Sequence, residues 1–250
     1  MLILGKHIAI MNSDMDGVRF GAAVGWARIA FTKNTLAFIA LSVVVMILQL
    51  GQQFAANPFT ETFSNCIDVG GAGASLDSAA MTTCFESEMG SLLIVIILAV
   101  LFVVASFLAT AGVIRGSLYV TQGRKIGFAD TFTGPYFGAF SLTVLLIMIT
   151  FVAGLFLFVV PAIIAMLLFQ FAPFFALDRG LSPFQALKSS IRLVRLNWPL
   201  AILVLLFSAA AYLLSGLFWG IPTLLFLPLA ALVTGYVYRT LQGEIVDPAS

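Results

Sequence analysis

The sequence predicts an all-α membrane protein with six transmembrane helices, arranged as three hairpins with cytoplasmic interfacial helices. Hydrophobic residues make up 61% of the 250-residue chain, whereas charged residues make up only 9%. A soluble domain contains about 25% charged residues, so water could not solvate this chain over its whole surface. Four apolar regions reach or double the roughly 20 residues that a membrane-spanning helix needs. The charged residues, finally, are sorted between the two sides that these spans define.

Residues 1–34 are predicted to form a cytoplasmic N-terminal tail and an amphipathic helix. The first ten residues contain Lys6 and His7, and they are too short to span a bilayer and lack the features of a signal peptide. Residues 35–250 form the predicted six-helix transmembrane domain, which includes an external loop over residues 55–90.

The six spans follow from the lengths of the apolar regions. Residues 36–54 and 91–114 each provide one span, and residues 137–177 and 198–238 are each about twice as long as one span requires. Pro161 and Pro222 lie near the middle of the two long regions, where the missing backbone donor of proline ends or kinks a helix. Each long region is therefore predicted to be a hairpin, with turns near residues 154–161 and 216–222.

The charges predict the orientation. The loop over residues 55–90 contains five acidic residues and no Lys or Arg, and all twelve basic residues of the chain fall on the other side of a six-span arrangement. Basic residues accumulate on the cytoplasmic side of membrane proteins. We therefore expect a multi-pass protein of the bacterial inner membrane with both termini in the cytoplasm.

A weak threefold repeat accompanies the hairpins. Each hairpin is preceded by a shorter segment, over residues 18–31, 126–136 and 183–196, and Asn34 and Asn197 each stand just before a span. Two interpretations remain open. One is an internal repeat, and the other is the ordinary accumulation of glycine and proline at tight membrane turns.

Small residues spaced by four mark two helix faces on which another helix could pack closely. The predicted helix-packing glycines are Gly17, Gly21, Gly25, Gly112 and Gly116. For the N-terminal helix, one interpretation is an interfacial helix beneath the chain's own spans, with Arg19 and Arg28 reaching lipid phosphates. The other is a docking site for a partner subunit.

Residues 183–196 are predicted to form a basic amphipathic helix at the cytoplasmic interface, with Ser182 as its cap. Phe184, Leu187, Ile191 and Val194 follow helical spacing on one side. Lys188, Arg192 and Arg195, on the other side, suit the headgroups of anionic lipids.

Cys66 and Cys84 are the chain's two cysteines, and both lie in the predicted external loop. Thiols outside the cytoplasm are oxidised, so a structural disulfide is predicted. It would close a loop rich in Gly, Ala and Ser and stabilise it by about 3 kcal/mol. A redox-active or metal-binding pair is the alternative, although zinc takes four ligands and no histidine lies nearby.

No ionisable residue lies in the middle of a predicted span, which disfavours an ion-coupled transporter. Gln49 and Gln170 are the polar candidates there, and such side chains usually bond to a neighbouring helix. We find no nucleophile with a base, no phosphate-binding loop and no basic excess. The sequence predicts neither an enzyme nor a cofactor, metal or nucleic-acid site.

The run Asp178-Arg179-Gly180-Leu181-Ser182-Pro183, followed by Ala186-Leu187-Lys188-Ser189-Ser190 and Asn197-Trp198, carries a family resemblance. It resembles a group of bacterial six-span membrane proteins of unknown function, and is similar to the membrane domain of some glycerophosphodiester phosphodiesterases. The likeness covers residues 137–244. It implies helical hairpins with interfacial helices, and it implies no activity because the catalytic domain and its metal ligands are lacking.

Together these features predict a non-catalytic accessory or scaffolding subunit of a larger bacterial membrane assembly, such as a respiratory or envelope-assembly complex. Its expected partners are membrane lipids and other membrane subunits. The alternative function is a transporter or flippase-like protein for a lipidic or apolar substrate, which would need no buried charge.

Overall fold

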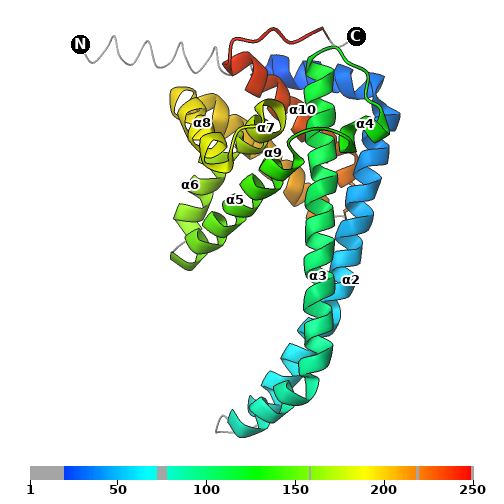
Figure 1. Cartoon of the computed structure of the whole chain (residues 1–250), viewed down its shortest axis with the longest axis vertical. Helices are drawn as coiled ribbons and strands as arrows, with labels where there is room; N and C mark the ends of the chain where they lie inside the picture. The colour runs from blue at the N-terminus through cyan, green and yellow to red at the C-terminus, as the bar shows by residue number, and fades with distance from the viewer. Residues whose placement is uncertain (1–19, 72–77, 158, 218–219, 249–250) are drawn as a thin grey trace, which may run out of the picture. The chain divides into compact units, whose positions relative to one another are not determined.

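The structure is a computed structural model that describes residues 20–71, 78–157, 159–217 and 220–248. The described residues are almost entirely helical and include no strand (Figure 1). They form two compact units. Unit 1 comprises the described residues of Met1–Val43 and Leu108–Ser250, and unit 2 those of Val44–Phe107. Six helical segments are long and apolar enough to cross a membrane, which confirms the predicted fold class.

The first hairpin consists of α2 (Thr35–Gly71) and α3 (Ser78–Thr121). The helices contain 37 and 44 residues. At about 1.5 Å per residue, each is nearly twice as long as a bilayer's hydrocarbon core is thick. Both helices continue through most of residues 55–90, the segment predicted as an external loop, so this segment is largely helical in its described part. Three of the four residues at 70–73 are glycine, which has the lowest helix propensity after proline.

Two further hairpins lie in unit 1, at the predicted positions. The first pairs α5 (Phe137–Leu157) with α6 (Val159–Phe169), and the second pairs α9 (Trp198–Leu217) with α10 (Thr223–Leu241). Within the first of these, a Cβ on Gly154 would lie only 3.0 Å from the backbone nitrogen of Ala162. Glycine therefore permits close approach where α5 and α6 meet.

The fourth predicted span is not one helix. It breaks at Gln170 and Phe171 into α6 and the short α7 (Ala172–Arg179). The Ser190 hydroxyl donates to the Leu168 carbonyl at 2.7 Å and accepts from the Phe171 N–H at 3.2 Å. The Gln170 amide donates to the Ala201 carbonyl at 3.0 Å. Ser190 thus supplies partners that backbone groups at a break in an apolar environment require, and Gln170 ties the break to α9.

Shorter helices precede the three hairpins, as the sequence predicts. They cover residues 20–33, α4 (Phe128–Phe132) and α8 (Pro183–Leu196). Asn34 and Asn197 occupy equivalent junctions. Each side-chain amide donates to the carbonyl four residues earlier, at 3.0 and 3.2 Å, and each backbone carbonyl accepts the first hydrogen bond of the following span. This shared geometry supports a repeat between the first and third hairpins, whereas the second has Tyr136 with a positive φ of 75° at that place.

Candidate functional site

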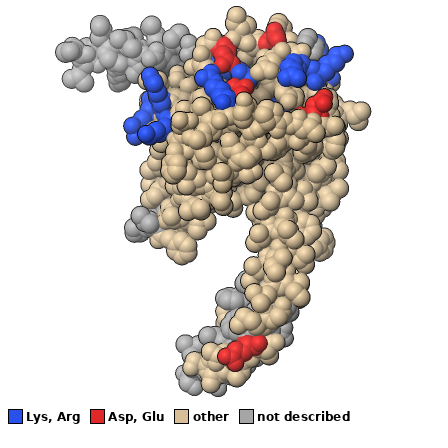
Figure 2. Space-filling view, viewed as in Figure 1, with Lys and Arg blue, Asp and Glu red and all other residues tan. Residues whose placement is uncertain are grey.

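Charged side chains gather at one end of unit 1, next to a surface of uncharged side chains (Figure 2). The elements that carry them are the C-terminal ends of α7 and α10, the whole of α8 and the segment that follows α10. This end is the candidate functional site, because it brings together charged side chains, which the middle of each span lacks.

A cluster of two arginines and two carboxylates joins α7, α10 and the C-terminal segment. Arg239 Nη2 lies 2.6 Å from Asp178 Oδ1, and Arg239 Nη1 bonds to Glu244 Oε2. Arg179 Nη2 lies 2.8 Å from Glu244 Oε1, and the Tyr238 hydroxyl donates to Asp178 Oδ2 at 3.1 Å. Every carboxylate oxygen in the cluster thus has a partner, so the cluster fixes structure and holds no free base.

The cluster is buried to different depths. The side chains of Arg239 and Asp178 are 7% and 12% exposed, whereas that of Glu244 is 33% exposed. Partial burial opposes ionisation of Glu244, but the hydrogen bonds and charges of Arg239 and Arg179 outweigh it and lower the pKa of this carboxyl. Two further bonds hold the terminal segment, from the Asp247 N–H to the Thr121 carbonyl at 3.1 Å and from Trp26 Nε1 to the Asp247 carbonyl at 2.9 Å.

Helix α8 begins and ends where the sequence predicts, but one predicted face differs. Its buried side consists of Ala186, Leu187, Ser190, Leu193 and Val194. Phe184 is exposed, on the same side as the three cations, because helical spacing places it one turn before Lys188. Its assignment to the face opposite the basic residues is therefore wrong, and so is that of Ile191, which lines a surface hollow together with the three cations. The Ser182 N–H donates to Gln185 Oε1 at 3.4 Å at the start of the helix.

Two surface hollows occur at this end of unit 1. The larger, of about 490 Å³, lies on α8 and is lined by Lys188, Ile191, Arg192, Arg195 and Leu196. The smaller, of about 370 Å³, lies among the helix over residues 20–33, α9 and α10, with Asn197, Tyr236 and Thr240 among its lining. The predicted lipid-contacting cations of α8 are thus brought together. Arg28 is exposed on another helix, and Arg19 lies outside the described residues.

The predicted packing glycines fall into two groups. A Cβ on Gly112 would lie 2.9 Å from the Phe132 ring, and one on Gly116 would lie 3.5 Å from the Phe38 ring. Both therefore lie in close internal contacts of α3. Gly21 and Gly25 have no described atom within 4 Å of such a Cβ, and the buried stripe of their helix is Ala23, Ala27 and Ala30. Gly17 lies outside the described residues.

Arg115 is a buried charge that the sequence does not reveal, because it stands just beyond a predicted span. The residue is 4% exposed. Its guanidinium donates to the Pro135 carbonyl and lies 4.3 Å from the centre of the Phe137 ring. It thereby anchors the segment between α4 and α5 to the end of α3. No pattern within the span signals this role, since the partners are a carbonyl and a ring 20 and 22 residues away.

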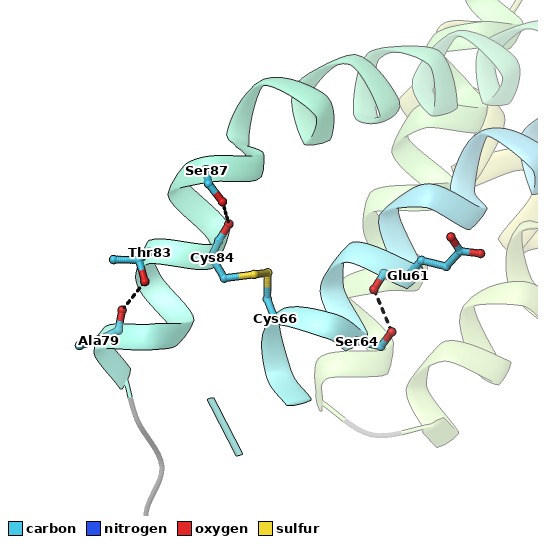
Figure 3. The surroundings of a disulfide bond; sticks show 7 residues. All are labelled: Glu61, Ser64, Cys66, Ala79, Thr83, Cys84 and Ser87. Carbon is cyan, nitrogen blue, oxygen red and sulfur yellow. Dashed lines mark hydrogen bonds between the residues drawn. A yellow bond between two sulfur atoms is a disulfide. The ribbon is translucent and has the colours of Figure 1, made fainter. Parts of the chain in front are cut away.

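In unit 2 the structure contains the predicted disulfide, which joins Cys66 of α2 to Cys84 of α3 (Figure 3). Cys66 is fully buried. Near the bridge the Thr83 and Ser87 hydroxyls donate to the carbonyls of Ala79 and Cys84. Among the described residues, no group of three or more His, Cys, Asp and Glu side chains is placed to hold a metal ion.

Comparison with known proteins finds relatives of unknown role. The chain is 29% identical over 252 residues to the uncharacterized protein Rv2560 of Mycobacterium tuberculosis, covering 94% of this chain and 73% of the relative. An uncharacterized protein of Mycobacterium bovis, Mb2590, is similar to the same extent. No family model matches the chain, and neither does any solved structure. The comparisons thus show no similarity to glycerophosphodiester phosphodiesterases.

Proposed function

We propose that this chain is a non-catalytic accessory or scaffolding subunit of a larger bacterial membrane assembly, and that the α2–α3 hairpin is its contact surface. One observation carries the proposal. Only 6% of the most apolar stretch of α3, within Leu93–Thr121, is buried inside the chain. Transmembrane helices associate through tight packing, and a span with so few buried residues leaves many exposed side chains for contact with another subunit.

The outer part of the hairpin supports the same proposal. Both helices run well past the apolar segments that end at Pro58 in α2 and begin at Leu93 in α3. There Ile67 and Met89 are exposed beside the acidic residues Glu61 and Glu86. Lipid tails do not cover side chains so far along the hairpin, so exposed apolar groups at this place favour a protein partner.

We assign the basic end of unit 1 to the cytoplasm and the hairpin tip to the opposite side, in a bacterial inner membrane. Within α3 alone, Glu86 and Arg115 are separated by about 44 Å at 1.5 Å per residue, which exceeds the thickness of the hydrocarbon core. The bias of basic residues toward the cytoplasm then selects the orientation.

Site-specific photo-cross-linking in native membranes tests the subunit proposal. A cross-linking side chain at Ile94 or Leu101 of α3 is expected to capture one defined protein. The matched controls, Leu145 of α5 and Ile163 of α6, are about as exposed and should capture lipid only. Native mass spectrometry should then show the chain in a complex with that protein. A chain that migrates as a monomer, and that cross-links equally from hairpin and control positions, would refute the proposal.

The alternative is a transporter or flippase-like protein for a lipidic substrate. The helix break between α6 and α7 favours it, because broken helices line substrate sites in many transporters. Against it, the Ser190 hydroxyl already bonds to the Leu168 carbonyl and the Phe171 N–H at the break, and Phe171 and Ala172 are fully buried. Proteoliposomes with a fluorescent lipid decide the matter: transbilayer movement faster than in empty vesicles supports the transporter, and equal rates exclude it.

A further inference from the structure

We infer that the exposed face of α8 is a binding site for the phosphate headgroup of an anionic phospholipid. The inference goes beyond the proposed subunit role and does not depend on it. The proposed ligand is a single lipid with a net negative headgroup, bound at a defined site, and the site differs from non-specific attraction to a charged membrane surface.

The first support is the spacing of the cations. Lys188, Arg192 and Arg195 are separated by four and three residues, which places them on one face of the helix, and they line the same hollow of about 490 Å³. The described ion pairs of the chain all involve Asp178, Arg179, Arg239 and Glu244. The three cations of α8 thus form a concentrated positive face that complements a phosphate.

The second support is the apolar component of the same face. Ile191 and Leu196 line the hollow together with the cations. Phe184 and Leu196 are each 72% exposed, and Trp198 beyond the helix is 60% exposed. Water alone would be a poor environment for these side chains. A bilayer interface suits both kinds, because phosphates lie beside the cations while acyl chains cover the apolar groups.

The third support is that the face is held in place from behind. The five buried residues of α8 pack into unit 1, and the Ser190 hydroxyl bonds to both sides of the break between α6 and α7. The backbone positions of the three cations are therefore fixed before a lipid arrives. Preorganisation of this kind reduces the entropic cost of binding and distinguishes a site from a flexible basic tail.

The test is lipid binding to the whole purified chain in mild detergent, followed by native mass spectrometry. The probes are phosphatidylglycerol, which is anionic, and phosphatidylcholine, which has the same phosphate but no net charge. Wild type is expected to retain phosphatidylglycerol in preference to phosphatidylcholine. The variant Arg192→Gln/Arg195→Gln should lose about tenfold or more in affinity for phosphatidylglycerol, since each cation near the lipid contributes substantially.

A matched variant, Arg124→Gln/Lys125→Gln, removes the same charge from exposed positions elsewhere in unit 1. It should change the affinity less than twofold. Because glutamine at exposed sites of α8 leaves its buried face intact, thermal unfolding should be unchanged in both variants. Equal retention of the two lipids by wild type, or equal losses in the two variants, would overturn the site. So would unchanged affinity in a folded Arg192→Gln/Arg195→Gln variant.

Discussion

At the scale of single residues, the turn between α7 and α8 depends on Gly180 for two independent reasons. Its φ is 62°, in the left-handed region that costs other residues about 1–2 kcal/mol. A Cβ there would also lie 2.4 Å from the ring of Tyr136. Gly180→Ala is therefore expected to lower the melting temperature in detergent clearly. Gly138→Ala is the control, because that Cβ would meet no described atom within 4 Å. Equal melting temperatures for the two variants would contradict this account.

Asp178 is the second residue on which the fold is expected to depend. Its carboxylate bonds to Arg239 and to the Tyr238 hydroxyl, and all three side chains are largely buried. Asp178→Asn removes one of the two carboxylates that pair with Arg239 and leaves Glu244 as the other. The variant should therefore lose at most the roughly 3 kcal/mol that breaking a buried ion pair costs. The double variant Asp178→Asn/Arg239→Gln should cost less than the sum of its single variants. Urea or thermal unfolding measures the loss of stability in the single and double variants. The control is Asp68→Asn, which changes an exposed carboxylate.

Sequence reasoning reaches some of these residues and misses others for physical reasons. Asp178 and Gly180 were noticed through their motif, but Arg239 and Glu244 were not connected with them. Their partners lie about 60 residues away in the chain, and only the packing of α7 against α10 brings them together. Arg115 was missed for the same reason. Cys66 and Cys84 could be paired from the sequence because they are the chain's two cysteines and lie in one predicted loop.

At the scale of elements, composition predicted the spans well and the breaks less well. Apolar length and two prolines placed the hairpin turns of unit 1, because proline acts locally on its own helix. The break at Gln170 has a local signal in Pro173, which lies in the first turn of α7 and cannot continue the preceding helix. The break is also stabilised by Ser190 from a later helix, which no local pattern indicates. The helical extensions of α2 and α3 are not predicted either, because the glycine-rich centre of the segment suggests an irregular loop over its whole length.

The disulfide makes a prediction about the hairpin as an element. The bridge closes a segment of 18 residues, and such a loop contributes about 3 kcal/mol through the unfolded chain. In the variant Cys66→Ser/Cys84→Ser, hydrogen exchange should accelerate in the outer parts of α2 and α3, over residues 57–71 and 78–90. Exchange in α5 to α10 is the internal control and should remain unchanged. Unaltered exchange at the hairpin tip would show that packing alone holds these helices together.

At the scale of the whole molecule, the C-terminal segment connects elements from across unit 1, and Glu244 makes this connection dependent on pH. Its pKa is lowered in the folded state, so its contribution to stability is present above the ordinary value of 4.5. That contribution is lost as pH falls below 4.5 and through the folded-state pKa. Glu244→Gln should therefore melt at a lower temperature than wild type at pH 7.

The difference in melting temperature between Glu244→Gln and wild type should stay constant down to about pH 5 and shrink at lower pH. Glu86→Gln, at an exposed carboxylate of unit 2, should differ little from wild type at any pH. If the difference in melting temperature between Glu244→Gln and wild type grew as the pH fell, the ion pairs of Glu244 could not be its cause.

The separation of charge along the whole chain leads to the last prediction, which concerns topology. Residues 34–114 contain no Lys or Arg, and all the basic residues lie before or after this stretch. If the basic ends lay outside the cytoplasm, each of these cations would have to be carried across the membrane, which is disfavoured. The assigned orientation keeps all of them in the cytoplasm. In a background without Cys66 and Cys84, a cysteine at Thr82 should react with a membrane-impermeant maleimide in intact cells. A cysteine at Lys125 should react only after permeabilisation, because α3 carries the two positions to opposite sides. Labelling of Lys125→Cys in intact cells, with Thr82→Cys protected, would reverse the assigned orientation, and equal labelling of both would contradict α3 as a spanning helix.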